Sequence, residues 1–137
     1  MKINLLIYFL SVTSLTFGQR DREVIKQIDS INTTALIYYN NNDIVKSFNG
    51  FNKAKSLAES IKDDYGHAIA NYNLGHIYNL MQNTNAAERC YNAMLKSADK
   101  IKDSYLIANA YFNLGKLNKD LKEFEKATFY FDNSLKQ

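Results

Sequence analysis

One segment of fifteen residues occurs twice in this chain, at an offset of forty residues. Residues 61–75 read IKDDYGHAIANYNLG and residues 101–115 read IKDSYLIANAYFNLG, so nine of the fifteen positions are identical. A self-match of this length at a fixed offset is the signature of stacked repeats, in which each unit buries its apolar face against its neighbours. The chain is therefore expected to fold as a series of similar units.

The composition favours helix and argues against several classes of protein. The 137 residues contain no proline, which would break helix interiors, and 46% of them are apolar, enough for a folded core. The net charge of +3 is too small, and the lysines too dispersed, to indicate a nucleic-acid surface. Cys90 is the only cysteine, which excludes an internal disulfide.

Apolar residues recur at steps of three and four through six segments, the spacing of one face of an α-helix. Turn-forming residues such as those at 40–43 and 82–85 separate the segments. Asp43 and Asp63 are expected helix caps, and Asn85 with Glu88 is interpreted as a capping box that opens the fourth helix. The predicted helices are 20–40, 44–62, 65–81, 86–101, 105–121 and 124–137.

The first eighteen residues have the order of a secretory signal peptide. Lys2 gives a positive start, residues 3–12 are mostly apolar, and Thr16-Phe17-Gly18 places small residues around a bulky one. We predict a signal peptide at 1–18, cleavage after Gly18, and export to the periplasm or the extracytoplasmic side of the membrane. The alternative is an uncleaved membrane anchor, although the apolar stretch is short for a span of about 20 residues.

Small and aromatic residues keep the same register in all three units. A glycine inside a helix costs about 1 kcal/mol relative to alanine, so its recurrence requires a packing reason. We expect the small residues to let paired helices approach and the aromatic ring to fill the groove between pairs. These repeat-packing residues are Ala35, Gly75 and Gly115; Ser47, Ala87 and Ala127; Phe51, Tyr91 and Phe131; and Tyr78.

Asn73-Leu74-Gly75 with Tyr78, Ala87 and Tyr91 resembles a tetratricopeptide repeat, and Tyr111, Asn113-Leu114-Gly115, Phe124, Ala127 and Phe131 resemble a second one. Residues 31–58 look like a degenerate first copy. Two features depart from the family pattern: the period is forty rather than the common 34, and the helix-ending proline is absent. Asn118 also stands where Tyr38 and Tyr78 predict an aromatic residue.

The resemblance implies an all-α, right-handed superhelical stack of about three antiparallel helix pairs, with repeats at about 24–62, 64–102 and 104–137 within a domain at 19–137. A stack of this kind needs a capping helix over its last apolar face. The sixth predicted helix leaves Tyr130, Phe131 and Leu135 uncovered. We therefore expect a missing C-terminal cap, with either further chain, a partner or self-association covering that helix.

Peptides usually lie on the concave face in this family, which the first helix of each pair would form. Asn73 and Asn113 match the family's groove asparagines, and Lys116 and Lys119 could meet a carboxylate. The alternative is that these residues serve packing or form a solvated face. The candidate peptide-binding residues are Asn32, Tyr39, Tyr72, Asn73, His76, Asn79, Phe112, Asn113, Lys116 and Lys119.

No pattern in the sequence indicates catalysis, a metal or a cofactor. His67 and His76 lie nine residues apart, about 2.5 turns of one helix, so they face opposite ways. There is no glycine-rich phosphate loop and no zinc-ligand spacing. Protein or peptide partners are expected, with no nucleic acid and no membrane contact except through an anchor or a further segment.

Two functions follow from the resemblance. The first is an exported, non-catalytic scaffold that binds peptides or proteins. The second is the extracytoplasmic sensory region of a longer bacterial signal-transduction protein, because a signal peptide followed by forty-residue repeats is similar to the sensor parts of membrane-bound histidine kinases and helix-turn-helix regulators. In the second case the signalling domain, including any kinase, would lie outside these residues.

The packing role of the recurrent glycine is testable. The substitution Gly75→Leu should wedge the helix pair apart and lower the free energy of unfolding by roughly 1–3 kcal/mol. Thermal unfolding followed by circular dichroism measures this effect. An unchanged melting temperature would contradict the packing role.

Overall fold

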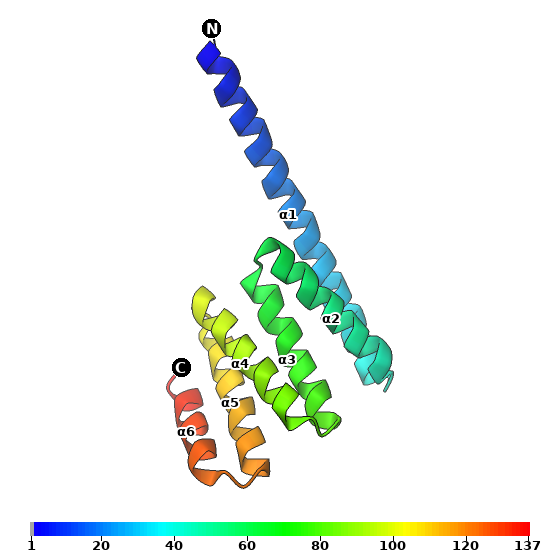
Figure 1. The fold of residues 1–137 in the computed structure, drawn as a ribbon, viewed down its shortest axis with the longest axis vertical. Coiled ribbons are helices and arrows are strands. Elements are labelled where there is room, and N and C mark those ends of the chain that lie inside the picture. The colour runs from blue at the N-terminus through cyan, green and yellow to red at the C-terminus, as the bar shows by residue number, and fades with distance from the viewer. Residues whose placement is uncertain (1) are drawn as a thin grey trace.

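The computed structural model describes the backbone of residues 2–137 and the side chains of residues 21–137. Within that range the chain folds into α-helices joined by short turns, with no strand (Figure 1). This confirms the predicted all-α stack of helix pairs. The helices are α1 (Lys2–Asn40), α2 (Ile44–Ile61), α3 (Asp64–Leu80), α4 (Thr84–Ile101), α5 (Ser104–Asp120) and α6 (Phe124–Leu135).

Consecutive helices pack against each other along the whole chain, and α1 also contacts α3. The first helices of the first two pairs therefore lie side by side. Figure 1 shows the three hairpins stacked in sequence order, with α1 extending beyond the stack at its N-terminal end. This arrangement gives one layer of first helices (α1, α3, α5) and one of second helices (α2, α4, α6).

The first helix begins earlier than predicted. The sequence reading placed its start at Arg20, whereas α1 is one continuous helix from Lys2. The segment before Arg20 contains no proline and only Gly18 as a weak helix former, so nothing in it ends a helix. The predicted signal peptide at 1–18 lies outside the residues whose side chains are described, and it stays a prediction. No helix in the described part of the chain is long and apolar enough to cross a membrane.

Every turn in the stack uses the same backbone device, at intervals of twenty residues. One residue before each new helix adopts a left-handed conformation: Asn42, Lys62, Gln82, Lys102 or Lys122, with φ between 56° and 62°. The next residue is the N-cap. Asp43, Asp63, Asn83 and Asp103 each accept a hydrogen bond from a backbone N–H of the first turn. Side-chain capping of this kind satisfies helix donors that have no intrahelical partner.

The predicted capping box at Asn85 is wrong. The side chain of Asn83 caps α4, with 3.1 Å between its Oδ1 and the nitrogen of Ala86, and Asn85 already lies inside the helix. Gln82 completes the left-handed turn after α3, so the next residue is the one in position to cap. The sequence pattern of asparagine followed by glutamate was therefore shifted by two residues.

The recurrent glycines make room for an aromatic ring from the second helix of the same pair. A Cβ atom on Gly75 would lie 2.5 Å from Cε1 of Tyr91, and one on Gly115 would lie 2.7 Å from Cε1 of Phe131. The atoms nearest to each glycine belong to these rings, so the aromatic side chain packs directly against the glycine of its own helix pair. Tyr91 also packs with Leu114 and Leu117 of α5, so its ring joins one pair to the next.

The two helices of the first pair approach each other as closely as those of the later pairs, but here the glycine lies on the second helix and an alanine lies on the first. Ala35 replaces the glycine of the later units, and Gly50 lies opposite it on α2. A Cβ on Gly50 would lie 2.7 Å from the Cβ of Ala35. Phe51 then fills the core beside Ala35, with 1% of its surface exposed. The divergence of the first copy is thus compensated across the helix pair.

The last turn lacks one interaction that the others have. Glu123 occupies the N-cap of α6 but makes no capping hydrogen bond, because its side chain is one methylene longer than aspartate. We expect Glu123→Asp to raise the free energy of unfolding by about 0.5–2 kcal/mol, measured by urea denaturation. The substitution copies Asp43, which caps α2 and also pairs with Lys46 at 2.7 Å. The corresponding ion pair of α6, between Lys126 and Glu123 at 3.5 Å, is already present.

The matched control is Glu125→Asp, which makes the same chemical change inside the first turn of α6, at an exposed position. It should change stability by less than about 0.5 kcal/mol. Equal effects of the two substitutions would show that charge near the helix end, and not capping, is responsible.

Candidate functional site

A groove of about 450 Å³ lies between α1 and α3 on the layer of first helices. It brings together Asn32 and Asn73, two of the residues predicted from the sequence to bind peptide. Gly66 makes the close approach possible, since the γ2 methyl group of Ile28 on α1 lies 3.0 Å from where a Cβ would sit. The remaining lining residues are Asp29, Thr33, Leu36, Tyr65 and Ile69.

The two asparagines differ in what they present to this groove. The Nδ2 of Asn73 donates to the backbone carbonyl of Ile69 at 2.9 Å, which leaves its Oδ1 to accept a hydrogen bond from a ligand N–H. The Oδ1 of Asn32 is covered by protein and has no hydrogen-bond partner.

Asn113 is less available than the family resemblance implies. It is only 6% exposed, and its Nδ2 donates to the carbonyl of Asn109 at 2.8 Å. Asn118 is bound in the same way, to Leu114 at 2.8 Å, which satisfies the amide that replaces the expected aromatic residue. These amides stabilise their own helix, and at most the oxygen of Asn113 reaches the surface.

Tyr72 and His76 form the centre of a second part of this layer. Their rings meet edge to face, with centroids 4.6 Å apart, and His76 meets Tyr91 in the same way at 5.8 Å. The Nε2 of His76 is buried without a hydrogen-bond partner. Burial first, and the positive charge of Lys116 second, lower the pKa of His76 from its usual 6.5. The imidazole is therefore neutral at pH 7.

The other predicted binding residues have mixed surroundings. Phe112 is 48% exposed, with the Nζ of Lys116 5.9 Å from its ring centroid. Asn79 and Lys119 are exposed on α3 and α5. Tyr39 packs against the core of the first pair with Tyr78 and Phe48. Tyr39 is therefore mainly a packing residue, while Phe112, Lys116 and Lys119 face solvent.

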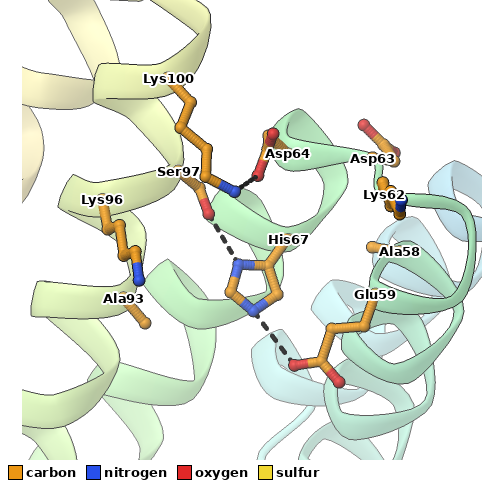
Figure 2. A pocket seen from close by; sticks show the side chains of 10 residues that line it. All are labelled: Ala58, Glu59, Lys62, Asp63, Asp64, His67, Ala93, Lys96, Ser97 and Lys100. Atoms are coloured by element: carbon orange, nitrogen blue, oxygen red, sulfur yellow. Dashed lines mark hydrogen bonds and ion pairs between the residues drawn. The ribbon is translucent and has the colours of Figure 1, made fainter.

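A second pocket, of about 480 Å³, opens between α2 and α4 (Figure 2). His67 crosses it: Nδ1 lies 2.8 Å from Oγ of Ser97, and Nε2 lies 3.2 Å from a carboxylate oxygen of Glu59. Lys100 pairs with Asp64 at 2.8 Å on the same rim. The side chains of three helices are joined here, an arrangement that the sequence reading did not find.

The serine, histidine and carboxylate of this pocket have the residue types of a catalytic triad, but their geometry suits a structural bridge. Ser97 is only 3% exposed, so a substrate carbonyl has no approach to its hydroxyl. When a serine attacks a carbonyl carbon, the carbonyl oxygen becomes negatively charged and needs fixed donors around it. The pocket lining offers lysine side chains on its rim in place of a fixed pair of N–H groups. We interpret His67 as a link between α2, α3 and α4.

Cys90 lies in the core of the stack and is 8% exposed. Burial raises the pKa of its thiol, which lowers the fraction of reactive thiolate. Burial likewise raises the pKa of the Tyr91 phenol above its usual range. Within residues 21–137, no cluster of three or more His, Cys, Asp or Glu side chains is arranged to hold a metal ion.

Sequence reasoning missed six of the eight residues of the α1–α3 groove. Asp29 and Leu36 lie three residues before and four residues after Asn32, so they share its helix face, and this spacing was a usable signal. Tyr65 belongs to the repeated segment and was assigned only to the helix start. The groove itself depends on the distance between α1 and α3, which the sequence pattern does not report.

The fold and the groove define the class of architecture. The protein is an all-α solenoid of helix pairs with a groove on its layer of first helices. Residues 66–136 match the family model of the tetratricopeptide repeat. The chain therefore belongs to the tetratricopeptide repeat family, whose domains are scaffolds for protein–protein interaction. No match was found among curated protein sequences.

The fold is also that of a solved tetratricopeptide domain. The TPR domain of FLU from Arabidopsis superposes with a TM-score of 0.74 and is 21% identical in sequence. The match covers 82% of this chain and 94% of that domain. At this level of identity the likeness concerns the fold alone.

The lowered pKa of His76 gives a prediction for pH. The imidazole titrates near 6.5 in the unfolded chain and at a lower pH in the folded one. Its contribution to stability is therefore complete above about pH 6.5 and is lost as the pH falls below that value. NMR titration of the His76 ring should give a midpoint below 6.5, and Lys116→Gln should move it part of the way back.

The matched control is Lys119→Gln, an identical change on the same helix at a lysine that is not among the causes of the shift. It should leave the midpoint unchanged. A wild-type midpoint at or above 6.5 would contradict the assigned burial of the ring.

Proposed function

We propose that this chain is an exported, non-catalytic scaffold that binds extended peptide or protein segments on its layer of first helices. The observation that carries the proposal is the α1–α3 groove, whose lining includes Asn32 and Asn73. The Nδ2 of Asn73 is bonded within its own helix, so its Oδ1 can accept a hydrogen bond from a backbone N–H of an extended peptide.

The rest of the layer offers contacts of other kinds to the same ligand. Tyr72 and Phe112 supply aromatic surface, which gives large contact area at low entropic cost. Lys116 and Lys119 are exposed cations at the α5 end and suit a carboxylate of the ligand. A peptide running from α1 to α5 would therefore meet oxygen acceptors first, then aromatic rings and lysines.

Export is supported by the order of residues 1–18, and it places the protein in the periplasm or on the extracytoplasmic side of the membrane. Fractionation of cells followed by immunoblot tests this part of the proposal. A soluble band slightly below 15.8 kDa in the exported fraction is expected for a cleaved chain. A band in the membrane fraction at 15.8 kDa would instead support the uncleaved anchor.

The second candidate is the sensory region of a longer bacterial signalling protein, and the exposed apolar side chains of α6 favour it. Phe124 is 63% exposed, Phe129 60% and Leu135 86%. A further helix would bury them, as α5 buries part of α4. Self-association of two chains through α6 is the competing explanation. A band much heavier than 15.8 kDa in the fractionation supports the sensor, and a concentration-dependent dimer supports self-association.

The binding surface is tested with a displayed library of random peptides selected on the wild-type chain. Peptides selected on the wild type should bind the Tyr72→Ala variant at least about tenfold more weakly, because the substitution removes an aromatic contact of roughly 1–3 kcal/mol. Lys119→Glu should weaken acidic peptides selectively, because it replaces attraction by repulsion. Fluorescence anisotropy of a labelled selected peptide measures both effects.

The control is Lys53→Glu, the same charge reversal at an exposed position of α2 in the layer of second helices. It should leave affinity unchanged. Binding that responds to Lys53→Glu and ignores Tyr72→Ala would move the site to the other layer, and a selection that enriches no peptide would contradict the scaffold proposal.

A further inference from the structure

The α1–α3 groove holds acceptors and no cationic side chain. The acceptors include the carboxylate of Asp29 and the Oδ1 of Asn73, whose Nδ2 donates to the carbonyl of Ile69. Thr33 donates its hydroxyl hydrogen to the carbonyl of Asp29 at 2.8 Å, so its oxygen also faces outward only as an acceptor. None of the eight lining residues is a lysine, an arginine or a histidine.

The negative charge of Asp29 is not neutralised by the protein. No ion pair or hydrogen bond to its carboxylate occurs among the described residues, whereas Asp43, Asp63 and Asp64 each cap a helix or pair with a lysine. The charged lysines of the layer, Lys116 and Lys119, lie on α5 and not in this groove. The ligand layer is therefore polarised, with acceptors between α1 and α3 and cations on α5.

The walls of the groove suit a long side chain with a cationic end. Leu36 and Ile69 provide apolar surface for a methylene stem, and Leu36 is 45% exposed. Tyr65 is 51% exposed at the rim, where its ring can stack on a planar cation. A guanidinium group has five donors in a fixed plane and no acceptor, which matches several fixed oxygens better than a peptide amide does.

We propose that the α1–α3 groove is a specificity pocket for an arginine side chain of the bound peptide. The guanidinium pairs with Asp29, donates to the Oδ1 of Asn73, and stacks on Tyr65. This inference rests on the proposed function, because it names the residue that the peptide contributes to that surface. It also orients the peptide, with arginine over α1 and α3 and any acidic group toward α5.

The first test uses a probe that needs no known partner. Nα-acetyl-arginine N-methylamide is titrated into the ¹⁵N-labelled full chain, followed by the side-chain amide signals of Asn32 and Asn73. A fragment of this size should bind with a dissociation constant on the order of millimolar. The citrulline analogue has the same shape without the charge, and it should shift these signals at least about tenfold more weakly, because hydrogen bonds to charged groups are the stronger ones.

Two substitutions on α1 separate the pocket from general electrostatics. Asp29→Asn keeps the size of the side chain and should abolish the preference for arginine over citrulline. Glu23→Gln makes the same acid-to-amide change at an exposed position of α1 outside the groove, and it should keep the preference. Two results would overturn the arginine pocket. One is an equal shift of the amide signals with the arginine and citrulline probes, and the other is an equal loss of the arginine preference in Asp29→Asn and Glu23→Gln.

The displayed-peptide selection distinguishes failure of this inference from failure of the proposed function. Selected peptides should carry an arginine whose replacement by citrulline lowers affinity at least about tenfold for the wild type and not for Asp29→Asn. Peptides that depend on Tyr72 but contain no such arginine would overturn the pocket and leave the scaffold standing. A selection that enriches no peptide would remove both.

Discussion

The stack depends on an aromatic ring that packs against a glycine, where no side chain takes up space. Tyr91 and Phe131 occupy the space that a Cβ would take on Gly75 and Gly115. The ring of Tyr91 is 2% exposed and also touches α5, so one contact sets the spacing within a pair and between pairs. Interiors are close-packed and tolerate little change in volume, so this contact fixes where α4 lies relative to α3 and α5.

The turns give the stack its second constraint. Left-handed residues recur every twenty positions, one in each turn, and a side-chain cap follows the first four of them. Four of the five left-handed residues are lysine or glutamine and none is glycine, so the backbone holds an unfavourable conformation at each turn. The capping bonds and the packing of the flanking helices offset that cost.

These two constraints explain why the layer of first helices carries the polar groups. The second helices of the first two pairs bury Phe51 and Tyr91, whereas Phe124 and Phe129 of α6 are exposed. The groove side of α1 and α3 carries asparagine, aspartate and threonine. Asn73 and Asn113 bond their own helices through nitrogen. The pocket on the other side has a different role, because His67 joins α2 and α4 through Glu59 and Ser97.

The sequence by itself determined the helices, the repeat period and the aligned small and aromatic packing residues of the three repeats. It could do so because apolar periodicity and turn-forming residues are local features, readable from neighbouring positions in the chain. It also predicted Asn32 and Asn73 as candidate peptide-binding residues. Only the tertiary structure decided that these two residues share a groove with Asp29 and Tyr65, that Asn113 is buried, and that the cap of α4 is Asn83. The physical reason is that groove width and burial depend on the distance between helices, which is set by contacts such as Gly66 with Ile28, far apart in the chain.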